Sequence, residues 1–493
     1  MTEAVDPYIE GVIMRGDEGS ALLAAKCAPT LRNSNHVDIV TEGINGIAVL
    51  RVPEGFSIVA HSASGDPNER NPEAHAMSLI DRLYADAQAV GATPLGMADV
   101  VDSSGSDKRL VASIADALAE GANKRKIAIL NGELAILGER VNCEANISGT
   151  MIGLIPRTYR HPLRFTKRGI EYVVIEPNDK AVYINSDGVG TKTELYERRA
   201  ELERYPAAIL PAFFDGAAML ADDAAKLFAE IKALFEVMGR NSEARSVDTQ
   251  ETANALSRRF GFEYVIAHEM VGDRLCGWKH GTAAYNISGS AVSLIDDETL
   301  KHLPIPEAGD YIIAISGKPN PRSNGITAKR AAMVKQFGQD WHKTPEGQMF
   351  LNFLAEPSTV FYPVFRELLR NNAATSVYHM SGGAYKGKLA KPLAKHGLYA
   401  KLEGLYQPDW RELALAGFEM APAEIAYAKW PMGTEGFVTI KQPDAALKTI
   451  SKYGLRGKVV GQLELSPDKT GVELVGVAAG GKNVYFSGLA EAA

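Results

Sequence analysis

The chain has 493 residues, more than a single hydrophobic core accommodates, so two or three domains are expected. Its residues are 46% hydrophobic and 23% charged, as in a soluble globular protein, and the net charge of −7 argues against nucleic acid or an acidic membrane surface as a partner. The three cysteines show no C-x-x-C spacing, which excludes a disulfide framework and a cysteine-rich zinc site. We expect a cytoplasmic protein, because the N-terminus is acidic without an apolar core and no apolar stretch is long enough to span a bilayer.

An internal repeat organises roughly the first 300 residues. The clearest echo is N-I-S-G-T-M-I-G-L-I at 146–155, which recurs as N-I-S-G-S-A-V-S-L-I at 286–295. Earlier echoes, first copy then second, are the strand-like runs 56–61 and 181–185, the helical periods 77–90 and 219–230, and the strands with a glutamate at 127–135 and 264–272. We therefore predict two copies of one α/β unit, residues 1–156 and 157–300, each ordered strand, helix, helix, strand and a last strand at N-I-S-G.

Both copies carry acids at positions where apolar residues are expected. These are Asp86 and Glu133 in the first copy and Asp222, Asp223 and Glu269 in the second. An unpaired carboxylate is costly to bury, so such acids face solvent, pair with a base or bind a metal. Solvent exposure is the commonest outcome for any one of them. Together with Asp187 they make a set suited to a magnesium nucleotide.

The second copy carries the loop S-D-G-V-G-T-K at 186–192, where the first copy has S-A-S-G-D-P-N and Ala63 stands opposite Asp187. Asp187 at a strand end suits a hard cation such as Mg²⁺. Gly188 and Gly190 let the backbone approach a ligand, and Thr191 and Lys192 add a hydroxyl and a cation for phosphate. The spacing is not that of a Walker P-loop, and a strand-ending turn with a solvated lysine is the alternative interpretation. The first copy instead keeps N-G-E-L, expected as a turn, which suggests one working site drawing on both copies.

The composition changes after residue 300, and we assign 301–493 to a third, different α/β domain. A strand at 309–316 feeds P-R-S-N-G and then a helix, and V-Y-H-M-S-G-G at 377–383 is a strand that ends in glycines. Strands at 436–440, 459–465 and 472–477 complete a mixed sheet. The two glycine loops suit an anion, the first because it precedes a helix and the second because of its lysines, although an ordinary turn is the alternative for each.

Taken together, these motifs resemble the AIR synthetase superfamily, most closely its phosphoribosylformylglycinamidine cyclo-ligase branch. S-D-G-V-G-T-K resembles the signature loop of that branch, P-R-S-N-G resembles P-H-S-N-G, and H-M-S-G-G resembles H-I-T-G-G-G. Asp86 with V-G-A-T-P-L, N-G-E-L-A at 131–135 and W-P-M-G-T-E-G at 430–436 resemble its N-D-x-x-x-x-G-A-x-P-L, G-G-E-T-A and F-N-M-G-V-G. The arginine of the P-T-R-x-Y motif is missing, because the chain has P-S-T-V-F at 357–361.

The resemblance implies an α/β (α+β) fold of the AIR synthetase type, in which two tandem N-terminal-type domains form an intrachain pseudo-dimer barrel, followed by one C-terminal domain. It implies an ATP- and Mg²⁺-dependent ligase of purine biosynthesis that phosphorylates the formamide oxygen of a ribonucleotide before ring closure. The implied residues are Asp187, Lys192, Asp86 and Glu133 for catalysis, with Asp187, Asp86 and Glu133 on the metal; Gly188, Gly190, Thr191, Lys192, Asn131, Gly132 and Asp223 for the nucleotide; and Ser323, Asn324, Gly325, Ser381, Gly382, Gly383 and Lys386 for the substrate.

Several alternatives stay open. Thiamine-phosphate kinase and formylglycinamidine ribonucleotide synthetase belong to the same superfamily, and the second should carry two C-terminal domains. Selenophosphate synthetase and the hydrogenase-maturation member are disfavoured by missing cysteine motifs. A non-catalytic nucleotide-binding subunit would also fit the degraded motifs, and a homo-oligomer is compatible with the sequence.

Overall fold

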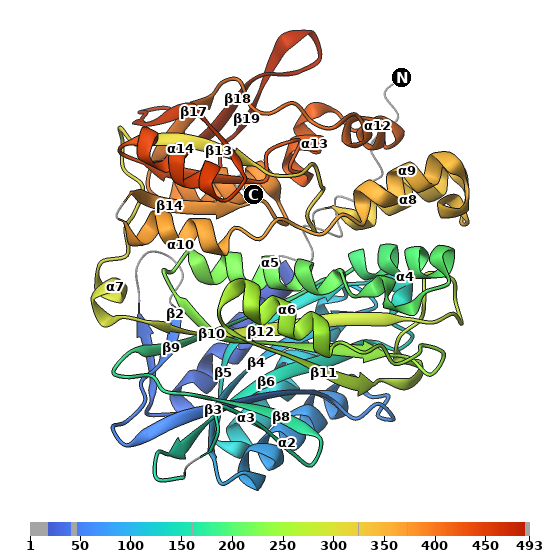
Figure 1. The fold of residues 1–493 in the computed structure, drawn as a ribbon, viewed down its shortest axis with the longest axis vertical. Coiled ribbons are helices and arrows are strands. Elements are labelled where there is room, and N and C mark those ends of the chain that lie inside the picture. Colours follow the sequence, from blue (N-terminus) through green and yellow to red (C-terminus); the bar gives the residue numbers. More distant parts are fainter. Residues whose placement is uncertain (1–17, 41–46, 160, 324, 372, 489–493) are drawn as a thin grey trace. The chain divides into compact units, whose positions relative to one another are not determined.

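The computed structural model describes residues 18–40, 47–159, 161–323, 325–371 and 373–488. Contacts divide the chain into two compact units, each described by itself below. Of the described residues, the N-terminal unit comprises those up to 220 together with 229–301, and the C-terminal unit comprises 221–228 and those from 302 onward. The predicted mixed α/β class is confirmed, because the chain forms three mixed sheets with helices between the strands (Figure 1).

The first half of the N-terminal unit alternates strands and helices. Its α2 begins where sequence signals place a helix start, since the Asn71 side chain accepts a hydrogen bond from the Ala74 N–H and Pro72 occupies the first turn. The elements are β1 (Val37–Val40), β2 (Ile47–Leu50), β3 (Phe56–Ser64), α2 (Pro72–Ala89), β4 (Thr93–Ser103), α3 (Lys108–Arg125), β5 (Ala128–Ile136), η2 (Gly138–Arg140) and β6 (Ala145–Pro156). The predicted order of strand, helix, helix, strand is wrong here, because the apolar β4 separates the two helices.

The second half repeats this order with an additional helix, α4, after its first long strand and a short one, α7, at its end. Its elements are β7 (Arg164–Lys167), β8 (Ile170–Ile175), β9 (Ala181–Gly188), α4 (Lys192–Glu203), η3 (Pro206–Ile209), α5 (Ala212–Ala225), β10 (Glu230–Arg240), α6 (Gln250–Phe260), β11 (Glu263–Met270), η4 (Gly272–Arg274), β12 (Tyr285–Ile295) and α7 (Asp297–Lys301). The helical period predicted to reach Glu230 ends at Ala225, and Glu230 instead opens β10.

Two six-stranded sheets form this unit, and each takes a hairpin from the other half of the chain. One sheet has the order β1-β2-β9-β12-β10-β11, and the other has the order β7-β8-β3-β6-β4-β5. The hairpin β1–β2 precedes β3 in the sequence but pairs with β9, whereas β7–β8 precedes β9 but pairs with β3. The two repeats are therefore interlocked rather than placed side by side.

Pairing across the repeats follows a pseudo-twofold axis. The hydroxyls of Ser148 and Ser288, the serines of the two N-I-S-G motifs, lie 2.6 Å apart. Val141 forms a β-bridge with Leu275, its own counterpart in the second repeat. In the strand registers Ala63 pairs with Gly149 and Asp187 pairs with Gly289, which confirms that Ala63 and Asp187 are equivalent positions.

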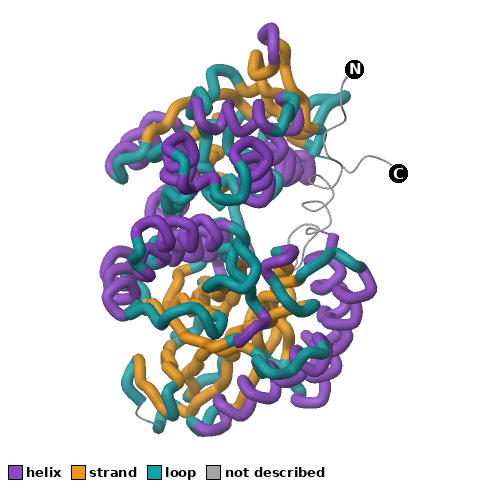
Figure 2. Tube along the Cα trace, turned by 90° about the vertical axis from the view of Figure 1, so that its right-hand side faces the viewer, coloured by secondary structure: helices purple, strands orange, loops and turns teal. Residues whose placement is uncertain are grey.

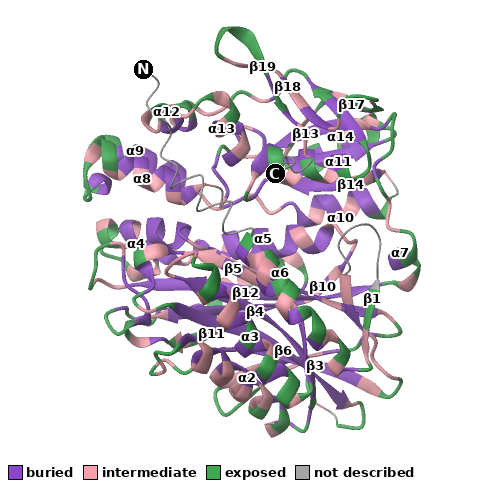
Figure 3. Cartoon of the chain, turned by 180° about the vertical axis from the view of Figure 1, so that it is seen from behind, coloured by how far each residue is buried: buried purple, intermediate pink, exposed green. Residues whose placement is uncertain are grey.

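The inner faces of both sheets bury one common apolar core. The strands lie between helices in Figure 2, and Figure 3 shows their central residues as buried. The core contains Ile58, Ala60, Leu95, Ala98, Ile152, Leu154, Val173 and Ile175 from one sheet and Leu50, Val182, Ile184, Ala233, Phe235, Val265, Val292 and Leu294 from the other. This arrangement is the predicted intrachain pseudo-dimer. Among the helices of the described ranges, none has the length and apolar character needed to cross a membrane.

The C-terminal unit is built on a seven-stranded sheet of order β14-β16-β13-β17-β15-β18-β19. The strands predicted at 309–316, 436–440, 459–465 and 472–477 and the helix after P-R-S-N-G are present, whereas the strand predicted at 377–383 begins earlier and ends at His379. Its elements are β13 (Tyr311–Ser316), α8 (Ile326–Phe337), η5 (Trp341–Lys343), α9 (Pro345–Leu354), α10 (Tyr362–Arg370), β14 (Ala374–His379), η6 (Tyr385–Ala390), α11 (Lys391–Lys395), β15 (Leu398–Leu402), α12 (Trp410–Phe418), α13 (Ala423–Lys429), β16 (Gly436–Ile440), α14 (Pro443–Lys452), β17 (Arg456–Leu465), β18 (Gly471–Ala478), η7 (Ala479–Gly481) and β19 (Lys482–Phe486).

The common core predicts that one truncation weakens both repeats. Phe235→Ala should lower the free energy of unfolding by about 3–5 kcal/mol, because Phe235 is fully buried between the sheets. Leu163→Ala is the control; its side chain is 65% exposed, and the change should stay within about 0.5 kcal/mol. Urea unfolding followed by circular dichroism measures both variants. Equal effects would contradict the common core.

Candidate functional site

The loop that follows β9 is a tight turn from a strand into a helix. Asp187 lies next to the end of β9, and one of its carboxylate oxygens accepts the Gly188 N–H at 2.7 Å. Gly190 has a φ of +63°, a conformation that other residues rarely adopt, and it turns the chain into α4. An added Cβ would have no neighbour nearer than 3.7 Å at Gly188 and 3.9 Å at Gly190. A small side chain would therefore be in ordinary van der Waals contact at both positions, so it is the positive φ of Gly190, rather than lack of room, that calls for glycine there.

Strand β5 of the first repeat meets this loop. The side-chain oxygen of Asn131 accepts hydrogen bonds from the N–H and the hydroxyl of Ser186, at 3.0 and 2.8 Å. Gly132 leaves no room for a side chain, because a Cβ there would come within 2.7 Å of Leu23 and 3.1 Å of Asp99. The predicted turn at N-G-E-L is wrong, since Asn131, Gly132 and Glu133 all lie within β5. The two repeats nevertheless meet at Asn131 and Ser186, beside the loop.

Lys192 does not stand as a solvated cation. Its side chain is fully buried at the start of α4, and its ammonium lies 2.7 Å from an Asp215 oxygen. The Tyr196 hydroxyl donates to the other oxygen of the same carboxylate. Thr191, the residue before α4, is also buried. The charge predicted for phosphate is therefore neutralised within the N-terminal unit, and Asp215 is a partner that sequence reasoning missed.

Asp86 belongs to a different place from the one predicted. With Arg82 and Glu269 it lines a cavity of about 670 Å³ in the N-terminal unit. Arg82 donates to both oxygens of Glu269, at 2.8 and 3.1 Å, and approaches Asp86 at 3.9 Å. Burial raises the pKa of Asp86, although Arg82 and Arg168 oppose the shift. Asp86 on α2 thus lies near β11. This cavity also includes Ser62, the neighbour of Ala63, so it corresponds by the pseudo-twofold symmetry to the surroundings of Asp187.

The glutamates of the two repeats are not equivalent either. Asp99 of β4 and Glu236 of β10 are counterparts, because they pair with the glycines of the two N-I-S-G motifs. Asp99 also pairs with Gly132 of β5, whereas Glu236 pairs with Ile266 of β11. Glu133 therefore corresponds to Ala267, and the predicted match with Glu269 is displaced by two residues. Within the described parts of the chain, no three His, Cys, Asp or Glu side chains gather in a metal-binding group, so Asp187, Asp86 and Glu133 do not form the predicted metal set.

In the C-terminal unit, a buried network joins residues 222–226 to both glycine loops. Arg322 is fully buried and donates to Asp222 at 2.9 Å and to the carbonyls of Met380 and Thr359 at 2.7 and 2.6 Å. His379 lies 2.9 Å from Asp223. Although burial opposes it, the Lys226 ammonium and His379 hold the pKa of Asp223 well below its usual range. Asp223, predicted for the nucleotide, is therefore paired, and Arg322 is a further residue missed from sequence.

The predicted substrate loops occupy defined positions in this unit. Gly325 precedes α8 with a φ of +58°, and an added Cβ would lie 2.2 Å from the indole nitrogen of Trp430. Ser323 lies beside it in the loop, and Asn324 lies outside the described residues. The other four are found between β14 and α11: Ser381, Gly382, Gly383 and Lys386.

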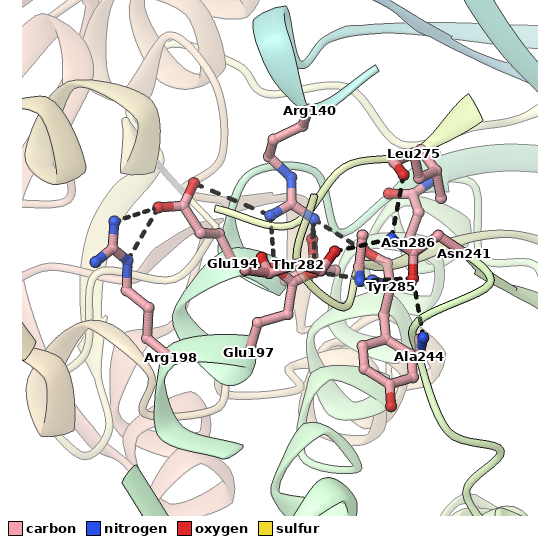
Figure 4. A network of polar contacts seen from close by, with 12 residues as sticks. Arg140, Glu194, Glu197, Arg198, Asn241, Ala244, Leu275, Thr282, Tyr285 and Asn286 are labelled. Atoms are coloured by element: carbon pink, nitrogen blue, oxygen red, sulfur yellow. Dashed lines mark hydrogen bonds and ion pairs between the residues drawn. The ribbon is translucent and has the colours of Figure 1, made fainter. Parts of the chain in front are cut away.

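A second buried network, also missed from sequence, centres on Arg140 of η2 (Figure 4). Its guanidinium donates to both oxygens of Glu197 at 3.0 and 2.9 Å, to the Thr193 hydroxyl at 3.0 Å and to the Tyr285 carbonyl at 2.9 Å. All three partners belong to the second repeat. The repetition of L-G-E-R at 137–140 as V-G-D-R at 271–274 is the sequence pattern that indicates a shared role for the two arginines.

Comparison with known proteins finds a family match within the first repeat. Residues 46–155 match the family described as AIR synthase related protein, N-terminal domain. A phosphoribosylformylglycinamidine cyclo-ligase of Pyrococcus horikoshii is 22% identical over 313 residues, covering 62% of this chain and 85% of the relative. That of Thermococcus gammatolerans is 26% identical over 151 residues, 31% of this chain and 41% of the relative. The chain thus spans less than half the length of the Thermococcus relative.

Solved structures are similar to parts of the chain at low identity. A thiamine-monophosphate kinase from Stenotrophomonas maltophilia has a TM-score of 0.41 at 13% identity and covers 66% of this chain and 94% of that one. Thermotoga maritima PurL, solved with FGAR, has a TM-score of 0.40 at 14% identity, with 62% and 45% covered. HypE of E. coli, a hydrogenase maturation protein, has a TM-score of 0.40 at 12% identity, with 63% and 87% covered.

The carboxyl group of Asp99, beneath Gly132, generates a pH prediction. Asp99 is fully buried, neither oxygen has a hydrogen-bond partner, and burial raises its pKa from 3.8 to about 8. The folded state therefore holds a proton that the unfolded state has lost between these values. Stability should fall as pH rises from about 4 to about 8, by as much as about 1.4 kcal/mol per unit from this group.

Asp99→Asn should remove this contribution. The free energy of unfolding of the variant, relative to that of the wild type, should therefore be higher at pH 8 than at pH 5. Urea unfolding at the two pH values measures the difference. Asp116→Asn, an exposed acid of α3 that pairs with Lys26, is the control and should leave the wild-type pH dependence in place. An unchanged slope in Asp99→Asn would exclude a proton on this buried carboxyl.

Proposed function

We propose that this chain, a member of the AIR synthetase superfamily, is an ATP-dependent cyclo-ligase that forms aminoimidazole ribonucleotide from formylglycinamidine ribonucleotide. We further propose domain boundaries near residues 156 and 300, with one working nucleotide site in the N-terminal unit. The relatives that match parts of the chain carry the cyclo-ligase name, which supports the proposal.

The observation that carries the proposal is the contact between Asn131 and Ser186. It holds β5 of one repeat against the strand that presents Asp187 in the other, so the carboxylate and the glycine loop sit at the boundary between repeats. Glycines at positions 188 and 190 suit a phosphate chain, because backbone N–H groups in glycine turns face anions well. At the equivalent place in the first repeat Ala63 supplies no carboxylate.

The reaction needs positioning and charge neutralisation more than a protein nucleophile. The formamide oxygen of the substrate attacks the γ-phosphorus of ATP and ADP departs, so a poor leaving group becomes a phosphate ester. A nitrogen of the same molecule then bonds to the activated carbon, and inorganic phosphate leaves. Asp187 would hold the Mg²⁺ that accompanies the nucleotide, since hard cations prefer carboxylate and phosphate oxygens. We propose that the loops at Gly325 and Gly382 bind the ribonucleotide.

One observation favours a second candidate, a subunit that binds nucleotide without turnover. Lys192 is committed to Asp215, so the cation expected at the transferred phosphate is already neutralised in this conformation. Binding of ATP with no turnover of formylglycinamidine ribonucleotide would support the binding subunit. Release of ADP together with aminoimidazole ribonucleotide would support the cyclo-ligase.

Asp187→Asn should abolish ATP-dependent turnover, because it removes the carboxylate that would hold the magnesium nucleotide, whereas Ala63→Asp should leave turnover nearly unchanged. Coupled ADP release, with thermal unfolding as a check on folding, measures both variants. Equal loss at the two equivalent positions would refute the model of a single working site.

A further inference from the structure

We propose that Arg140 of the first repeat is a positioning residue for the nucleotide loop of the second repeat, acting through the hydroxyl of Thr193. The inference rests on the proposed function, since it concerns the same loop. It adds a residue outside the resemblance motifs, and it identifies the contact by which one repeat sets the conformation of the other.

The contact is a relay of two hydrogen bonds. Arg140 donates to the Thr193 hydroxyl at 3.0 Å, and that hydroxyl donates to the Gly190 carbonyl at 2.8 Å. Gly190 is the residue whose φ of +63° turns the chain between Asp187 and α4. Because Arg140 has only donors, the direction of both bonds is fixed: the hydroxyl accepts from Arg140 and gives its own hydrogen to Gly190.

The anchor of the relay is rigid. The Arg140 guanidinium is buried, and it makes a bidentate pair with Glu197 while donating to the Tyr285 carbonyl. Glu197 in turn accepts the Tyr285 N–H at 2.8 Å, so α4 and the start of β12 are held together (Figure 4). Bidentate arginine–carboxylate pairs fix geometry as well as charge. The donor to the Thr193 hydroxyl is thus held in a fixed position.

The pseudo-equivalent arginine lacks this relay. Arg274 donates to the Ala145 carbonyl, as Arg140 does to that of Tyr285, but its other contact is the backbone carbonyl of Glu69. Glu69 occupies the position that corresponds to Thr193, and no hydroxyl there continues the chain. The relay therefore exists only in the repeat that carries Asp187, which agrees with a single working site.

The test compares two substitutions at Thr193. Thr193→Val keeps the shape and removes the hydroxyl, and it should raise the Kd for a non-hydrolysable ATP analogue with Mg²⁺ about fivefold to tenfold. Thr193→Ser keeps the hydroxyl and should stay within about twofold of the wild type, since the relay survives. Arg140→Lys should weaken binding as Thr193→Val does, whereas Arg274→Lys should not. Equal Kd values for the valine and serine variants would overturn the inference.

A second measurement separates the relay from the proposed function. Amide hydrogen exchange of residues 187–193, recorded without nucleotide, should be faster in Thr193→Val than in the wild type and unchanged in Thr193→Ser. Faster exchange in a protein whose wild type binds no nucleotide would keep the relay and refute the proposed function. Unchanged exchange in Thr193→Val would refute the relay, whatever the nucleotide affinity.

Discussion

The inner face of each N-terminal sheet is apolar and can be buried only against the other sheet. Sixteen buried side chains, divided evenly between the sheets, form that common core. Burial of apolar area is the dominant favourable term in folding, so the two repeats stabilise one structure rather than two. Everything proposed for the site depends on this constraint, because Asn131 reaches Ser186, and Arg140 reaches Thr193, only while the sheets are packed together.

The two repeats are alike near the pseudo-twofold axis and differ away from it, and this difference leaves one proposed site. Ser148 and Ser288 are equivalent residues whose hydroxyls are hydrogen-bonded to each other. Arg140 and Arg274 each donate to the carbonyl of the first residue in the last strand of the other repeat. Away from the axis the copies differ. The second repeat keeps Asp187 and the Thr193 hydroxyl, whereas the first has Ala63. The cavity with Asp86 is lined by both repeats, and in it Arg82 of the first pairs with Glu269 of the second.

Short-range patterns predicted much of the fold, whereas the partners of charged groups depended on packing that no local pattern contains. Strand β16 was predicted with its observed ends, because turn residues and β-branched runs are local signals. The sequence could not show that Lys192 pairs with Asp215, since both residue types are usually exposed. Asp86 was assigned to the wrong site for a related reason: equivalent positions in a repeat do not specify which of two symmetry-related clefts they face.

The exchange of hairpins limits how such a chain is made and divided. Strands β1 and β2 leave the ribosome before β9 exists, so their sheet waits until more than 130 further residues have been synthesised. Pairing over such long loops is slow, because closure entropy precedes any gain from contacts. A gene cut between the repeats would yield two fragments that each carry the other's edge strands. Reassembly from such fragments would recreate, between two molecules, the interlocking that the fused chain enforces within one.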